Sequence, residues 1–171
     1  MKNYIGGRRH LQYIINKMYS YDLTTRKFAE VLSGEKSQVL LGYPEAKTAK
    51  YLGVNSRAKI LLKKNYALHM DNSGHFTGIG YGARGHNDPF PLSMSQLSKI
   101  PYIIKTAQMH EIQPDKKVRG LQRYRITRKM RKKQIIVVEV SIKRNEIDLV
   151  TAYNLVKKRH PHNRRRLLSR G

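Results

Sequence analysis

The sequence predicts an α+β protein in which a helical N-terminal half packs on an antiparallel sheet of four or five strands. Apolar residues in residues 11–53 recur at helical spacing, whereas from residue 109 onward they alternate or run together as they do in strands. Helices therefore come first and an antiparallel meander follows, an order that is typical of α+β folds.

Start and stop signals divide residues 11–53 into helices. Ile14, Ile15 and Met18 have the i, i+3, i+4 spacing of a helix that buries one face. The signals for the later helices are Asp22 as a cap and Gly34 as a stop, then Pro44 in a first turn and Gly53 as a stop.

The middle of the chain predicts a short strand, a helix, a long loop and a second helix. The loop is rich in Gly, Asn, Asp and Pro, and long ordered loops are often functional. The four elements are a strand at Lys59–Leu62, a helix at Lys64–Met70, the loop at Asn72–Pro91, and a helix from Ser93 or Ser95 to about Gln108.

The C-terminal half predicts strands followed by a basic tail. In Val118–Lys129 the odd positions, which include Arg119, Arg123 and Arg125, share one face. Ile135–Ile142 is an apolar strand, Arg144–Glu146 is turn-like, and Ile147–Tyr153 is the returning strand. The expected organisation is a helical segment at 1–58, a main domain at 59–156 and a basic tail at 157–171.

Lysine and arginine greatly outnumber the acidic residues. The sequence has 35 Lys and Arg but only 11 Asp and Glu, so the formal net charge is +24. Without the last fifteen residues the net charge would still be +17. Such a charge favours a polyanionic partner, with nucleic acid first and an anionic membrane surface second. No apolar run approaches the roughly 20 residues that span a bilayer. Cysteine is absent, which excludes disulfides and thiolate chemistry.

RNA can be cleaved without a metal, and this sequence has the residue types that the reaction uses. The 2′-hydroxyl attacks the neighbouring phosphate when a base removes its proton, an acid protonates the leaving oxygen, and cations stabilise the transition state. Two-metal nucleases instead need clustered carboxylates, and the acidic residues here are scattered singly. We therefore expect neither a metal nor another cofactor.

Histidines, hydroxyls and basic residues are the candidates for this chemistry. His69 lies late in a short helix and His75 in the loop that follows, and histidine exchanges protons near neutral pH. Thr151 and Tyr153 alternate on one face of the last strand, although both residue types also favour strands for structural reasons. The candidate RNA-binding cations are Lys63, Lys64, Arg119, Arg123 and Arg125, with a solvated charged face as the alternative.

Glu139 interrupts an apolar strand and is a further candidate for catalysis. A three-residue hairpin loop at 144–146 would pair it with Thr151, where a general base would lie beside the hydroxyl. A two-residue loop would pair it with Val150, on the opposite face from Thr151. The sequence leaves this register open. The alternative role for Glu139 is a structural ion pair with a nearby arginine.

Several short segments between about Lys59 and Lys158, roughly 60% of the chain, carry a family resemblance. They are Ile60–Asn65, His69, His75, Leu97–Ile104, the basic strand, Ile136–Val140 and Val150–Tyr153. Their order and spacing resemble the ribonuclease superfamily that unites barnase, EndoU, the colicin-type tRNA nucleases and RelE (the BECR fold), especially its phage- and mobile-element-associated branch.

The resemblance implies helices packed on an antiparallel sheet of four or five strands, and metal-independent RNA cleavage that leaves a cyclic phosphate. The sequence departs from the family in a Gly-rich insertion after His75 and in residues 1–58, which match no part of it. The roles implied are a helix histidine at His69, a hydroxyl pair at Thr151 and Tyr153, and sheet cations at Arg119, Arg123 and Arg125.

The leading interpretation is a toxin-type endoribonuclease acting on RNA, with tRNA as a candidate substrate. Such a protein would act in the cytoplasm after delivery by a phage or a secretion system, and an acidic antitoxin or immunity protein would neutralise it. The alternative is a non-catalytic RNA-binding protein such as a ribosome-associated factor, which the composition fits equally well. A DNA-binding regulator ranks last because no helix-turn-helix is evident.

Overall fold

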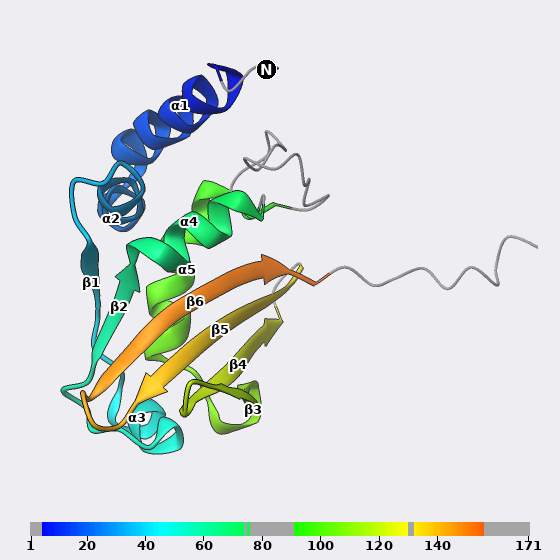
Figure 1. The fold of residues 1–171 in the computed structure, drawn as a ribbon. Coiled ribbons are helices and arrows are strands. Elements are labelled where there is room, and N and C mark those ends of the chain that lie inside the picture. The colour runs from blue at the N-terminus through cyan, green and yellow to red at the C-terminus, as the bar shows by residue number, and fades with distance from the viewer. Residues whose placement is uncertain (1–4, 74, 76–90, 130–131, 156–171) are drawn as a thin grey trace, which may run out of the picture.

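Within the described residues, 5–73, 75, 91–129 and 132–155, the computed structural model contains one six-stranded sheet (Figure 1). The strands are β1 (Gln38–Gly42), β2 (Lys59–Lys63), β3 (Ile112–Val118), β4 (Leu121–Lys129), β5 (Lys133–Ser141) and β6 (Glu146–Asn154). Their order in the sheet is β1-β2-β6-β5-β4-β3. Neighbours are antiparallel except β2 and β6, which are parallel. The α+β class is confirmed, and the sheet is mixed and larger than expected.

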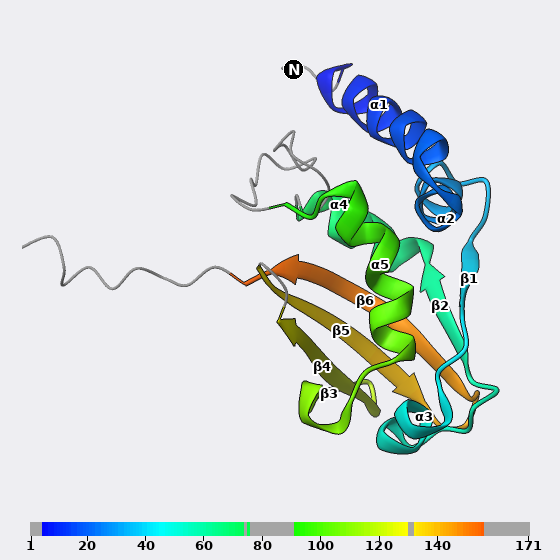
Figure 2. The ribbon, with the colours of Figure 1, turned by 180° about the vertical axis from the view of Figure 1, so that it is seen from behind.

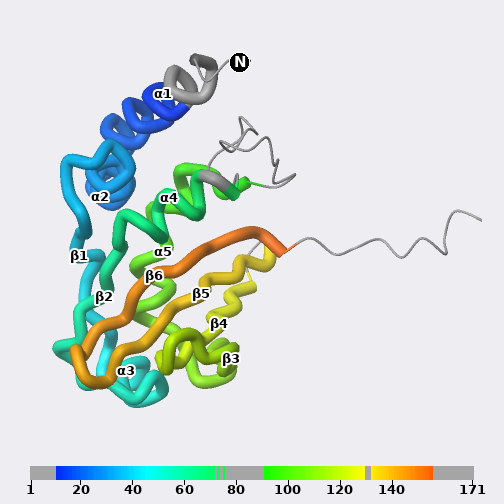
Figure 3. Tube along the Cα trace, in the orientation of Figure 1, coloured from blue at the N-terminus to red at the C-terminus, as the bar shows by residue number. Residues whose placement is uncertain are grey.

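The helices leave one face of the sheet open. Helix α5 lies across the other face (Figure 2), while α1, α2 and α4 gather at one end of the sheet and α3 lies at the opposite end. The tube in Figure 3 shows α1 extending away from the sheet beyond α2. No described helix is both long and apolar enough to cross a bilayer. The helices are α1 (Ile5–Tyr21), α2 (Leu23–Leu32), α3 (Ala46–Leu52), α4 (Lys64–Asn72), α5 (Met94–Lys105) and the 3-10 turn η1 (Met109–Glu111).

Side-chain caps fix the starts of α2 and α5, as the sequence predicts. The Asp22 carboxylate accepts a hydrogen bond from the Thr25 backbone N–H at 2.8 Å, and the Thr25 hydroxyl accepts one from the Asp22 N–H at 3.2 Å. Ser93, rather than Ser95, forms the equivalent capping box of α5. Gly53 ends α3 in a left-handed conformation, with a φ of 74°. Helix α5 ends at Lys105, three residues before the expected end.

One hydrophobic core joins the N-terminal helices to the sheet. Phe28 of α2, Leu97 of α5 and Leu149 of β6 are fully buried members of the same cluster. The sheet also continues across the expected boundary at residue 58, because β1 and β2 on either side of it pair antiparallel. The N-terminal segment therefore contributes a strand and core residues to the unit that carries the open face.

Two local expectations are wrong. Residues 11–53 are not all helical, since Gln38–Gly42 form β1, in which Val39 and Leu41 alternate as buried residues. An apolar run this short does not distinguish a strand from a buried helix segment. Arg119 is not part of a strand face: with φ of 50° it forms, together with Gly120, the tight turn between β3 and β4.

The β5–β6 hairpin has neither of the two expected registers. Residues 142–145 form a four-residue loop, so Glu139 pairs with Asp148 rather than with Thr151 or Val150. A bulge then shifts the register by one residue, and Thr151 pairs with Val137. The tail at 157–171, and all of the loop at 72–91 except residues 72, 73, 75 and 91, lie outside the described residues.

Candidate active site

Two rows of side chains cross the helix-free face of strands β4, β5 and β6, which we call the open face. In the first row, Arg123, Glu139 and Asp148 are direct neighbours on adjacent strands. Because residues two apart in a strand share a face, a second row lies beside the first. That row contains Arg125, Val137 and Thr151.

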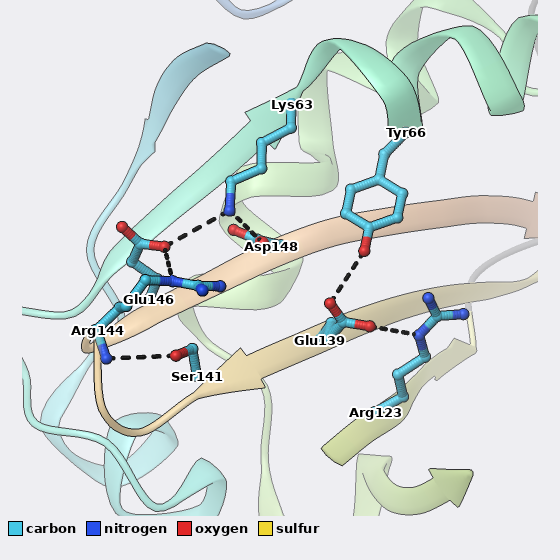
Figure 4. A network of polar contacts seen from close by, with 8 residues as sticks. All are labelled: Lys63, Tyr66, Arg123, Glu139, Ser141, Arg144, Glu146 and Asp148. Carbon is cyan, nitrogen blue, oxygen red and sulfur yellow. Dashed lines mark hydrogen bonds and ion pairs between the residues drawn. The ribbon is translucent and has the colours of Figure 1, made fainter. Parts of the chain in front are cut away.

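Glu139 is held between two donors at the centre of the open face (Figure 4). The Tyr66 hydroxyl of α4 donates to one carboxylate oxygen at 3.0 Å, and Arg123 Nε donates to the other at 2.8 Å. The side chain of Glu139 is only 8% exposed and that of Arg123 17%. The ion pair offered as the alternative role of Glu139 is thus present.

Tyr66 belongs to this site, although no pattern in the sequence indicated it. It lies one turn before His69 on α4, and the placement of α4 beside β6 carries its ring over the open face (Figure 4). Burial, followed by the hydrogen bond to Glu139, raises the pKa of the Tyr66 phenol above the usual tyrosine value. The phenol is therefore kept protonated and able to donate.

A second network occupies the end of the open face nearest the β5–β6 turn (Figure 4). Lys63 Nζ lies 2.6 Å from an Asp148 oxygen and 3.5 Å from Glu146, and Arg144 Nε lies 3.0 Å from the same Glu146 oxygen. Two carboxylates therefore neutralise Lys63, which makes it a poor phosphate ligand. Burial raises the pKa of the Asp148 carboxyl, and the bond from Lys63 opposes the shift without cancelling it.

Replacing Asp148 by asparagine should change stability in a pH-dependent way. Because its folded-state pKa is raised, Asp148 contributes stability that is fully present below the ordinary aspartate value of about 3.9 and is lost as pH rises through the folded value. The unfolding free energy of the wild type minus that of Asp148→Asn should fall as pH rises from about 3.5 to 7. Urea unfolding at a series of pH values measures this difference. A difference that grows with pH would show that the bond from Lys63 lowers the pKa of Asp148 more than burial raises it.

An apolar patch with a histidine lies at the other end of the open face. Ile135, Val137 and Val150 form a small buried cluster against which Tyr66 and Tyr153 pack. The His75 ring stacks on Tyr153 with ring centroids 5.7 Å apart and the planes 28° apart. Thr151 Oγ1 is buried and finds no hydrogen-bond partner among the described residues. The structure therefore brings His75, Tyr153 and Thr151 to the face that also holds Glu139.

The remaining predicted residues do not join this group. His69 is exposed on α4, where its carbonyl accepts a hydrogen bond from the Ser73 N–H, but no hydrogen bond or ion pair connects its side chain to another described residue. Lys64 is exposed at the first position of α4, and Arg119 is exposed in the β3–β4 turn. Of the predicted cations, Lys63, Arg123 and Arg125 lie on the open face, and Lys63 is paired there with two carboxylates.

The chain matches no protein-family model, no curated protein and no solved structure. Its chemistry must therefore be inferred from the open face itself. Arg125 is the least neutralised cation there: its nearest acid, Asp115, is 3.9 Å away, and its Nε has no acceptor within the part of the chain that the structure describes. Over the same residues, no three His, Asp or Glu side chains are arranged to hold a metal ion.

Proposed function

We propose that this protein is an endoribonuclease that cleaves RNA by attack of the 2′-hydroxyl, with its active site on the open face. One observation carries the proposal: a histidine, a tyrosine hydroxyl and two arginines, far apart in the sequence, share one sheet face. The face provides a proton-transfer group, a neutral hydrogen-bond donor and cations, which are the parts that metal-independent cleavage needs.

In this proposal His75 moves the protons and the arginines bind the phosphate. The 2′-oxygen loses its proton to a base and bonds to phosphorus, the bond to the 5′-oxygen breaks, and that oxygen receives a proton from an acid. Arg125 and Arg123 stabilise the negative charge that builds up on the phosphate. Glu139 is a positioning residue, because both its oxygens are already bonded to Tyr66 and Arg123. The products are a 2′,3′-cyclic phosphate and a 5′-hydroxyl.

His75 also limits how the face could serve as a simple binding platform. Its ring stacks on that of Tyr153, so a base cannot use this side of Tyr153 without displacing His75. An RNA-binding protein that reads bases by stacking would leave such a ring free. This supports cleavage over the alternative, a non-catalytic RNA-binding protein.

Incubating the purified protein with total RNA in excess EDTA tests the proposal. We expect discrete fragments with cyclic phosphate ends, and a His75→Ala protein purified in the same way controls for contaminating nucleases. RNA that is bound but remains intact would overturn the enzyme proposal in favour of RNA binding. A toxin role in the cytoplasm adds a second expectation, namely neutralisation by an acidic antitoxin or immunity protein.

Arg125→Ala should reduce the salt dependence of RNA binding, because it removes a phosphate contact. The log–log slope of affinity against salt changes by about 0.7 for each phosphate neutralised on a single strand. We expect the slope to become shallower by about that amount, measured by fluorescence anisotropy in EDTA between about 50 and 200 mM salt. Lys99→Ala is the control: it also removes one positive charge, but from an exposed residue of α5 on the other side of the sheet, and it should leave the slope unchanged. Equal slopes for the two variants would show that Arg125 on the open face does not contact an RNA phosphate.

A further inference from the structure

A cleft of about 500 Å³ lies between α5 and the end of β1. Helix α5 covers the helical side of the sheet (Figure 2). The cleft is separate from the open face, because α5 and the sheet lie between them. Four of its residues, Ser98, Pro101, Tyr102 and Lys105, form one stripe along α5. The other walls are Thr24 of α2 and Leu41, Gly42, Tyr43 and Pro44 at the end of β1.

Exposed aromatic side chains make this cleft unlike an ordinary surface. Tyr102 is 63% exposed and Tyr43 46% exposed, although both are large side chains. Exposed aromatic surface of this kind is typical of binding sites, and tyrosine is enriched among the residues that dominate protein interfaces.

Pro101 adds an apolar ring to the same stripe of α5, next to Tyr102. The cleft therefore combines aromatic and proline surface.

We propose that this cleft binds an acidic partner protein through an extended segment, with an apolar side chain between Tyr43 and Tyr102 and a carboxylate on Lys105. Charge complementarity identifies the partner: Lys105 is the one charged residue among the described lining residues, and the whole chain carries a net charge of +24. Grooves lined by aromatic residues are a recurrent site for extended, proline-containing segments. The proposal does not depend on RNA cleavage.

RNA and an added β-strand fit this cleft less well. RNA needs several phosphates neutralised at once, and the lining offers a single cation, whereas the open face offers two arginines. A partner strand would have to pair with the outer edge of β1, but Lys27 Nζ already donates to the Leu40 carbonyl at 2.8 Å. A lysine that covers an edge strand in this way blocks strand addition.

The test uses synthetic ten-residue peptides that combine Pro, Leu and Tyr with Asp and Glu, and matched peptides with Asn and Gln in place of the acids. Their affinity for the full chain is measured by fluorescence anisotropy for the wild type, Tyr102→Ser and Tyr13→Ser. Tyr13 is similarly exposed, at 54%, but lies on α1 outside the cleft. Both substitutions preserve the net charge, so nonspecific attraction by a basic protein is the same in all three proteins.

We expect the acidic peptides to bind the wild type and Tyr13→Ser, with a loss of at least about tenfold in affinity for Tyr102→Ser. Lys105→Gln should weaken the acidic peptides and leave the neutral ones unchanged. Equal affinities for the two tyrosine variants would overturn the proposal, as would the absence of any binding. It would also be overturned if Tyr102→Ser impaired instead the binding of an RNA oligonucleotide or the self-association of the chain. RNA cleavage by Tyr102→Ser, assayed in parallel, reports separately on the open face.

Discussion

Replacing His75 by alanine should lower the rate of RNA cleavage by about 10²- to 10⁴-fold, the usual contribution of one positioned acid or base. His75 is the histidine that the structure places on the open face, where its ring stacks on Tyr153. The loss should appear in single-turnover rates at saturating protein, because a proton-transfer group affects the chemical step more than binding. Affinity for RNA in EDTA should change little, since Arg123 and Arg125 remain.

His69→Ala is the matched control for this prediction. His69 lies six residues earlier and is exposed on α4, and its side chain makes no polar contact with another described residue. We expect its removal to leave the cleavage rate within about threefold of the wild type, well below the contribution of a catalytic acid or base. The opposite result, with His69→Ala inactive and His75→Ala active, would restore the helix histidine that the family resemblance implies and would exclude His75 as the proton-transfer group.

Arg123→Met should lower the free energy of unfolding by about 3–5 kcal/mol, the usual cost of breaking a buried ion pair by removing one partner. Its partner Glu139 would keep a buried charge with only the Tyr66 hydroxyl to compensate it. Urea unfolding followed by circular dichroism measures the change as a shift of the midpoint. The effect is large because both side chains lie largely out of water.

Two further variants test whether the uncompensated charge of Glu139 causes the loss of stability in Arg123→Met. Arg123→Met combined with Glu139→Gln should regain most of the loss, because a neutral amide still accepts from Tyr66 and needs no counter-ion. Arg144→Met removes an arginine from the ion pair with Glu146, but Arg144 is 51% exposed, so we expect a cost below about 1 kcal/mol. If Arg123→Met lowered the free energy of unfolding no more than Arg144→Met, the charge of Glu139 would not need Arg123 to compensate it.

Local signals predicted most of the elements of this fold. The Asp22 and Ser93 caps and the Gly53 stop act within a few residues, so the sequence alone indicates where α2, α5 and α3 begin or end. The alternation around β4 and the apolar run of β5 likewise gave strands at nearly the right positions. Strand β1 was missed because three apolar residues fit either period, and its pairing with β2 is a long-range choice.

The site was harder to predict, because its geometry depends on register. A four-residue loop at 142–145 and one bulge place Thr151 opposite Val137, whereas a three-residue loop at 144–146 would have placed Glu139 opposite Thr151. Tyr66 was missed for a related reason: only the tertiary position of α4 brings it to Glu139. Residue types therefore favoured a class of chemistry that stays a prediction, while only the structure could place His75, rather than His69, on the open face.

The position of β6 in the sheet has a consequence for how a chain still being synthesised behaves. It is the last of the described strands, yet it lies between β2 and β5, so it alone joins the β1–β2 pair to the β3–β4–β5 meander. Until residues 146–154 have left the ribosome, the two parts of the sheet have no shared partner, and β2 and β5 both expose an unpaired edge. Tyr153 and Thr151 arrive with that strand. The nascent protein thus cannot assemble the proposed catalytic face before β6 has been made, so the proposed cleavage would begin only after residue 154 has left the ribosome.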